Sequence, residues 1–258
     1  MHIRTFGINS KIGYKEYYID GDIINKIYEI NNQGCEEIVS IPDGCIDIEI
    51  LYKDGNISTM LCGSHVEGMI SEVGNYDYCF GIKFNPGARP NVITGKVADI
   101  INQRIEIQAF DHIDEIQTQL FKNSSFESKI DYFVNYFEPK NLKNNLKNQQ
   151  EINITTYVIS QIEKHCGAVN IAQLVDDIGY SQCYINRVFK EDMGISIKKY
   201  ADIIRMQESL KLLRKEKETE IYEKLGYYDQ AHFIKAFKKF TTLTPKRYKE
   251  SKAAISFV

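Results

Sequence analysis

Two stretches near the C-terminal end of the sequence repeat the same landmarks, and this repeat limits the fold of the chain more than any other feature. Residues 171–200 align with residues 221–248 when one extra residue is allowed near Tyr228. Each copy has the pattern of a helix, a glycine turn and a second helix, the layout of a helix-turn-helix unit. One such copy is common in solvated helical domains, whereas two matched copies favour a pair of recognition units. The matched landmarks are Gly179-Tyr180 with Gly226-Tyr227, Phe189-Lys190 with Phe237-Lys238, and Tyr200 with Tyr248.

Residues suited to capping predict where these helices begin and end. Asn170 and Ser181 are expected to cap the two helices of the first copy, and Asp229 the second helix of the second copy. Gly179 is expected to adopt the positive φ that ends the first helix. Apolar residues then recur at intervals of three and four along each second helix, so one face packs inward and the other faces outward.

The outward faces of the two second helices carry the side chains that we expect to bind DNA. Amides and arginine can read base edges in the major groove, while lysines suit phosphates. The N-terminal residues of a recognition helix are the ones that reach base edges. The candidates are Gln182, Cys183, Asn186, Arg187 and Lys190 in the first copy, and Gln230, Ala231, His232, Lys235 and Lys238 in the second.

The segment between the two copies predicts one long helix over residues 195–215. A helix of about 20 residues is about 30 Å long. This length is close to the spacing of successive major grooves on one side of a duplex, about 34 Å. The two copies could therefore read successive grooves.

Residues 155–250 resemble the DNA-binding domain of the AraC/XylS family of transcription regulators, which has two helix-turn-helix units on a linker helix. Two positions depart from the family pattern: Thr242 stands where a glycine is common, and Ile197 where a proline is often found. The resemblance implies a sequence-specific DNA-binding regulator. It rests on Ala172, Gly179-Tyr180-Ser181, Phe189-Lys190, Gly194, Tyr200, Arg205, Gly226-Tyr227, Phe233, Phe237-Lys238 and Thr244-Pro245-Lys246-Arg247-Tyr248.

The first part of the sequence predicts strands. Ile46, Ile48 and Ile50 alternate with other residues, which is the pattern of a strand buried on one face. Asp54-Gly55 then supplies a hairpin turn. Residues 35–110 resemble the β-rich, cupin-like N-terminal domain of some AraC-type regulators, through the Pro42-Asp43-Gly44-Cys45 and Phe84–Arg89 elements. A sensor domain is what this resemblance implies.

These observations predict an α+β fold of two domains. Residues 1–137 form a β-rich sensor or dimerisation domain with helices at about 111–137, residues 138–153 a polar linker, and residues 154–258 a double helix-turn-helix domain. The charge differs between the halves: residues 151–258 carry 18 Lys and Arg against 14 Asp and Glu, and residues 1–150 carry 14 against 21. The basic half suits an anionic partner.

Three features bear on an alternative function, a cupin-type enzyme with an accessory helical domain. Asp47 and Glu49 share a strand face, which we interpret as solvated and outward. The five histidines form no HxH or HExxH set, so we expect no metal. Arg89 follows a Pro-Gly turn and could pair with an anionic ligand or within the structure. No phosphate-binding glycine loop is present, and we predict neither catalysis nor a cofactor.

The sequence therefore favours a cytoplasmic transcription regulator that binds double-stranded operator DNA. No signal peptide or membrane span is expected. The six cysteines are expected to be free thiols, most of them buried. The sequence leaves three further partners open. They are a small-molecule effector, RNA polymerase, and a second copy of the chain in a homodimer formed through a stripe of Phe126, Phe133 and Phe137. An effector site lined by Phe80, Phe84, Ile46 and Ile48 would favour an apolar compound.

Overall fold

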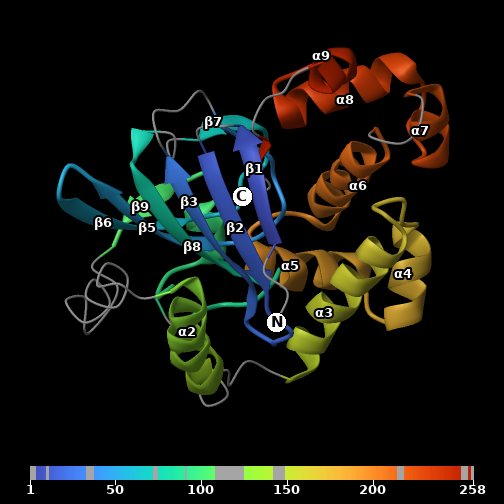
Figure 1. Cartoon of the computed structure of the whole chain (residues 1–258). Helices are drawn as coiled ribbons and strands as arrows, with labels where there is room; N and C mark the ends of the chain where they lie inside the picture. The colour runs from blue at the N-terminus through green and yellow to red at the C-terminus, as the bar shows by residue number, and fades with distance from the viewer. Residues whose placement is uncertain are drawn as a thin grey trace.

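The computed structural model describes residues 4–9, 12–32, 38–71, 75–90, 92–107, 125–141, 149–213, 218–250 and 255–256. A strand-rich part lies beside a helical part (Figure 1). The strand-rich part, which we name the sensor part after its predicted role, comprises β1 (Arg4–Asn9), β2 (Ile12–Tyr18), β3 (Ile24–Asn32), β4 (Ile38–Ser40), β5 (Asp47–Lys53), β6 (Asn56–Cys62), β7 (Met69–Ser71), β8 (Tyr78–Phe84), the 3-10 helix η2 (Val97–Ile100), β9 (Arg104–Glu106) and α2 (Phe126–Asn141).

The strands form two sheets. The larger sheet has the order β1-β2-β3-β8-β5-β6-β9, and all of its neighbouring strands are antiparallel. Asp54 and Gly55 connect β5 to β6 with φ angles of 49° and 82°, which confirms the predicted hairpin turn. The smaller sheet has the order β10-β4-β7, where β10 (Ile255–Ser256) comes from the far end of the chain.

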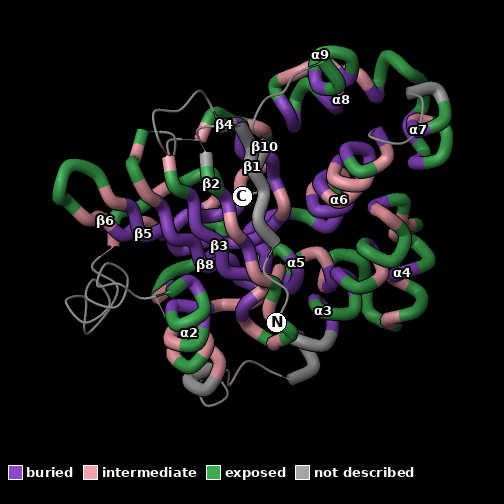
Figure 2. Tube along the Cα trace, in the orientation of Figure 1, coloured by how far each residue is buried: buried purple, intermediate pink, exposed green. Residues whose placement is uncertain are grey.

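One face of the larger sheet is apolar and is covered by α2 (Figure 2). Phe80 lies 5.1 Å from Phe133 between ring centroids, and Phe84 lies 5.1 Å from Phe137. The Phe stripe of α2 is therefore buried against the sheet, so the prediction that this stripe forms a dimer surface is wrong. The homodimer itself stays a prediction. The same packing places Phe80 and Phe84 in an apolar core shared with α2, and the apolar effector site itself stays a prediction. The expected helix before Phe126 lies outside the described residues.

The opposite face of the larger sheet carries buried charges. Asp47 and Glu49 are 6% and 3% exposed, so the interpretation of this face as solvated is wrong. Lys83 donates to Asp47 at 3.0 Å and also to Asp43, and Arg104 pairs with Glu49 at 2.6 Å. Burial raises the pKa of Asp47 to about 7. Charges this deep require partners of opposite sign, which the sheet supplies across its own strands.

The structure also bears on two smaller predictions, the pairing of Arg89 and the state of the cysteines. Arg89 donates to the backbone carbonyl of Gly95 and forms no ion pair with the described residues; its pairing with an anionic ligand stays a prediction. Cys45, Cys62 and Cys79 are buried free thiols, Cys166 is half-buried and Cys183 is exposed.

The helical part packs around an apolar core that also includes Val39 and Ile41 of the strand-rich part. It comprises α3 (Gln149–Lys164), α4 (Ile171–Ile178), α5 (Gln182–Met193), α6 (Ile197–Leu213), α7 (Glu218–Lys224), α8 (Gln230–Thr241) and α9 (Pro245–Glu250). None of the helices described is long and apolar enough to cross a membrane. Because α2 continues to Asn141 and α3 begins at Gln149, helices enter both ends of the range predicted as a linker; the domain boundaries stay a prediction.

Candidate nucleic-acid interface

The first helix-turn-helix unit consists of α4 and α5. The side chain of Asn170 accepts from the backbone N–H of Ala172, and that of Ser181 accepts from Tyr184, so both predicted N-caps are confirmed. Gly179 ends α4 with φ of 76° in the left-handed region, which confirms its predicted role. The inward side chains of α5 are fully buried, and they fix this helix by its apolar face; they are Ile185, Val188, Phe189 and Met193.

The second unit, α7 and α8, repeats this arrangement. Asp229 caps α8 by accepting from the backbone N–H of His232 at 2.6 Å, as predicted. Phe233 and Phe237 are fully buried, with ring centroids 5.7 Å apart. The C-cap residue, Thr242, has φ of 64°, a conformation that is unfavourable for a side chain with a Cβ atom.

The structure places all ten candidate DNA-binding residues on α5 and α8. Nine of them are exposed, and Asn186 is half-buried because its amide donates to the carbonyl of Gln182 on the same helix. Arg187 forms an ion pair of 3.0 Å with Glu191 one turn along. Both partners are about half exposed, so this pair is weak enough to exchange for a base or a phosphate.

Helix α6 connects the two units. Its 17 described residues give a length of about 25 Å, and the last two residues of the predicted range lie outside the described residues. Tyr200, Ile203 and Leu210 are fully buried between the units. Arg205 donates to the carbonyl of Gly167 at 2.8 Å and lies over the ring of Tyr227, so it joins the first unit to the second.

The sensor part touches both units at the C-terminal ends of their recognition helices. At the end of α5, Gly194 packs against Ile101 and the backbone of Val97. At the end of α8, the backbone N–H of Gly68 donates to the carbonyl of Lys239 at 3.1 Å, and Glu67 pairs with the Lys239 ammonium at 3.0 Å. Neither contact covers the N-terminal residues of the recognition helices.

A third contact joins the sensor part to α6. The carbonyl of Pro42 accepts from the Gln207 amide at 3.0 Å, and Gly44 lies against the ring of Tyr200. Asp43, between them, turns into the sensor part and pairs with Lys83 on the charged sheet face. This short loop thus touches the buried charges and the linker helix at the same time.

Comparisons with known proteins agree with this geometry. A family model described as a helix-turn-helix domain matches residues 174–251. The C-terminal domain of the two-component response regulator yesN from Fusobacterium nucleatum is 30% identical, over 38% of this chain and 98% of that one, with a TM-score of 0.35. The transcriptional regulatory protein HptR of Staphylococcus aureus is 33% identical over 93 residues, 35% of this chain and 37% of the relative. Residues 174–251 thus belong to an AraC-type helix-turn-helix domain.

A further curated relative is also named as a regulator. An uncharacterized response regulatory protein of Staphylococcus epidermidis is 38% identical over 98 residues, which is 37% of this chain and 39% of the relative. The chain thus spans less than half the length of this relative and of HptR. Because these relatives are named as regulators, the alternative of a cupin-type enzyme finds no support among them.

The sequence did not indicate the contacts between the sensor part and helices α6 and α8. Glu67 and Gly68 are separated from Lys239 by more than 170 positions, and no local pattern marks them as partners. Gly44 follows Pro42 and Asp43 in a turn sequence and has φ of 79°, and Gly68 is an isolated glycine, but neither local sequence indicates which distant helix approaches it. Only the structure brings them to α6 and α8.

Proposed function

We propose that this chain is a sequence-specific transcription regulator that reads operator DNA with α5 and α8. The observation that carries the proposal is the pair of exposed recognition faces held by a single linker helix. Inserted into neighbouring major grooves, the two helices would contact base edges through residues near their N-termini. The basic surplus of residues 151–258 supplies phosphate contacts.

The ten candidate residues divide by chemistry. Arg187 is suited to guanine, and Gln182, Asn186 and Gln230 to adenine, because each can form two hydrogen bonds with the base edge. Lys190 and Lys238 are suited to phosphates, which position the protein without reading sequence. Cys183, Ala231, His232 and Lys235 complete the surface that faces the groove.

The sensor part would control the DNA-binding part through its contacts with α5, α6 and α8. The loop of Pro42, Asp43 and Gly44 supports this proposal, because a change at the Asp43–Lys83 pair moves the same loop that holds Gln207 and Tyr200 of α6. A small-molecule effector can shift the protein between two arrangements only if it binds them with different affinity. The charged sheet face favours a polar effector over the apolar one expected from the sequence.

The test uses the full chain and an operator obtained by selection from genomic DNA. Arg187→Ala should weaken binding to the cognate site by about 1–3 kcal/mol and relax specificity at one base position. Lys238→Ala should weaken binding to all sequences alike and reduce the salt slope by about one.

Lys211→Ala serves as the control, because Lys211 is an exposed lysine of α6 outside the recognition helices. A selection that returns no preferred sequence for the wild-type chain would contradict the proposed function. An unchanged specificity profile for Arg187→Ala would remove this residue from the base-reading set.

A further inference from the structure

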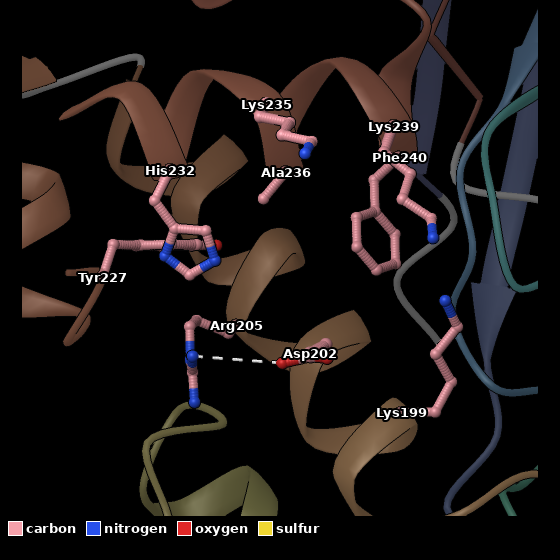
Figure 3. Close-up of a pocket in the computed structure, with 9 residues that line it drawn as sticks. All are labelled: Lys199, Asp202, Arg205, Tyr227, His232, Lys235, Ala236, Lys239 and Phe240. Atoms are coloured by element: carbon pink, nitrogen blue, oxygen red, sulfur yellow. Dashed lines mark ion pairs between the residues drawn. The ribbon is translucent and has the colours of Figure 1, made fainter. Parts of the chain in front are cut away.

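A cleft of about 270 Å³ lies between α6 and α8, on the side of α8 next to its recognition face (Figure 3). Its floor is apolar and well covered: Tyr227 is 8% exposed and Phe240 is 5% exposed. Its rim is basic and accessible, with His232, Lys235 and Lys239 contributed by α8. A concave site with an apolar floor and a few polar groups is the usual form of a small-molecule site.

The cleft has an excess of positive charge. Lys199, Arg205, Lys235 and Lys239 line it, against the single carboxylate of Asp202. Arg205 is already engaged, since it donates to Gly167 and lies 3.9 Å from Asp202. The ammonium groups of Lys199 and Lys235 have no carboxylate partner among the described residues. Three lysines thus line one space, and among the described residues a carboxylate, that of Glu67, pairs with only one of them, Lys239.

Lys199 and Lys239 point toward one another across the cleft (Figure 3). Lys199 lies over the ring of Phe240, with its Nζ atom 5.2 Å from the ring centroid. Partial burial and then the nearby charge of Lys239 lower the pKa of Lys199. An anion between the two ammonium groups would replace this repulsion by two attractive contacts.

We propose that this cleft binds a free small molecule that carries a phosphate group. A phosphate monoester has close to two negative charges at neutral pH, and lysine ammonium groups bind it as point charges. A ligand with a single carboxylate would balance only one of Lys199 and Lys235, the two lysines of the cleft that have no carboxylate partner among the described residues. The aromatic floor of Tyr227 and Phe240 would accept the uncharged remainder of the molecule.

The sensor part influences which phosphate can enter. Glu67 pairs with Lys239 at the rim, and Gly68 bonds to the backbone at the end of α8. In this arrangement a duplex backbone cannot approach Lys239 without displacing both residues, whereas a small molecule can enter beside them. Once bound, it competes with Glu67 for Lys239 and so weakens the hold of the sensor part on α8. The effector site then lies on the DNA-binding half, which goes beyond the proposed function.

Isothermal titration of the full chain with pyrophosphate, at constant ionic strength and without DNA, tests the inference. We expect one site per chain. Lys199→Met keeps the packing on Phe240 but removes the charge, and should weaken binding about tenfold or more. Lys211→Met, a matched change on the same helix outside the cleft, should leave binding unchanged. Glu67→Gln removes the competing carboxylate and should tighten binding about two- to fivefold.

The opposite signs expected for Lys199→Met and Glu67→Gln separate a site from a folding defect. Absence of pyrophosphate binding by the wild-type chain overturns the inference, and so does equal weakening by Lys199→Met and Lys211→Met. A third overturning result is unchanged pyrophosphate binding by Lys199→Met together with a smaller salt slope for DNA, because Lys199 would then be a contact to the duplex backbone. The pyrophosphate titrations contain no DNA, so their results do not depend on the proposed function.

Discussion

The two helix-turn-helix units are built from matching parts but are attached to the sensor part by different chemistry. Helix α5 ends at Gly194, which packs against the apolar side chain of Ile101. Helix α8 ends at Thr242 and is held by an exposed ion pair and one backbone hydrogen bond. Apolar packing is insensitive to salt, whereas an exposed ion pair is weak and screened. The second unit is therefore the one that the sensor part can release with the smaller change in free energy.

The largest expected effect comes from closing the space at the end of α5. Gly194→Ala would place a Cβ atom 2.8 Å from Ile101 at a residue with φ of 71°, and should destabilise the chain by about 2–4 kcal/mol in urea unfolding. Gly179→Ala is the control, since its φ is 76° but no atom lies within 4 Å of the added Cβ. Equal losses for the two variants would mean that backbone strain alone acts at Gly194.

A smaller and more local effect is expected at the end of α8. A Cβ atom on Gly68 would collide with the carbonyl of Phe240, so Gly68→Ala should separate the sensor part from α8. Breaking this docking should lower the protection of α8 amides in hydrogen exchange by about 1–3 kcal/mol and leave α5 unchanged. Gly226→Ala, which has open space around it, tests whether any glycine change nearby has the same result. Equal loss of protection in α5 would contradict the difference between the units.

A substitution at the C-cap of α8 should increase stability, because this position holds Thr242. The C-cap of α5 is already a glycine, Gly194. Thr242→Gly removes a Cβ atom from a residue with φ of 64° and should stabilise the chain by about 0.5–1 kcal/mol. Thr242→Ala keeps the Cβ atom and should give no such gain. Thermal unfolding of both variants measures the difference, and a gain with alanine equal to that with glycine would show that the left-handed backbone is not the cause.

The smallest expected effect is the response to salt. Raising KCl from 50 to 500 mM should screen the pair of Glu67 and Lys239 and lower protection at the end of α8 by about 0.2–1 kcal/mol. The end of α5 should not respond, because Gly194 packs against the apolar side chain of Ile101 and the uncharged backbone of Val97. Equal responses of the two helices would remove the electrostatic part of the comparison.

The sequence predicted those parts of the molecule whose structure is determined locally. Asn170, Ser181 and Asp229 cap their helices through neighbours two or three residues away, so the caps can be recognised without the fold. The exposure of the recognition faces follows from helical spacing in the same way. For the same reason the hairpin at Asp54-Gly55 was predictable.

The features that were missed depend on contacts distant in the sequence. Alternation along β5 shows that Asp47 and Glu49 share a face, but it does not show what covers that face. Lys83, Arg104 and the loop at Asp43 cover it, and they come from other strands and a connection. The expectation of a solvated face failed because burying a charge is disfavoured unless partners are present, and the partners could not be seen locally.

The pairing of β10 with β4 gives the molecule a second connection between its halves, made of backbone hydrogen bonds in addition to the covalent chain. Ile255 aligns with Val39 and Ser256 with Ser40, so the DNA-binding part is tied to the sensor part both before α3 and after α9. If the contacts at Gly68 and Gly194 open, the two surfaces remain at an effective concentration in the millimolar range. Re-docking is then a first-order event whose rate does not change with the number of protein copies in the cell. A regulator built in this way would return to its docked arrangement as fast at low abundance as at high abundance.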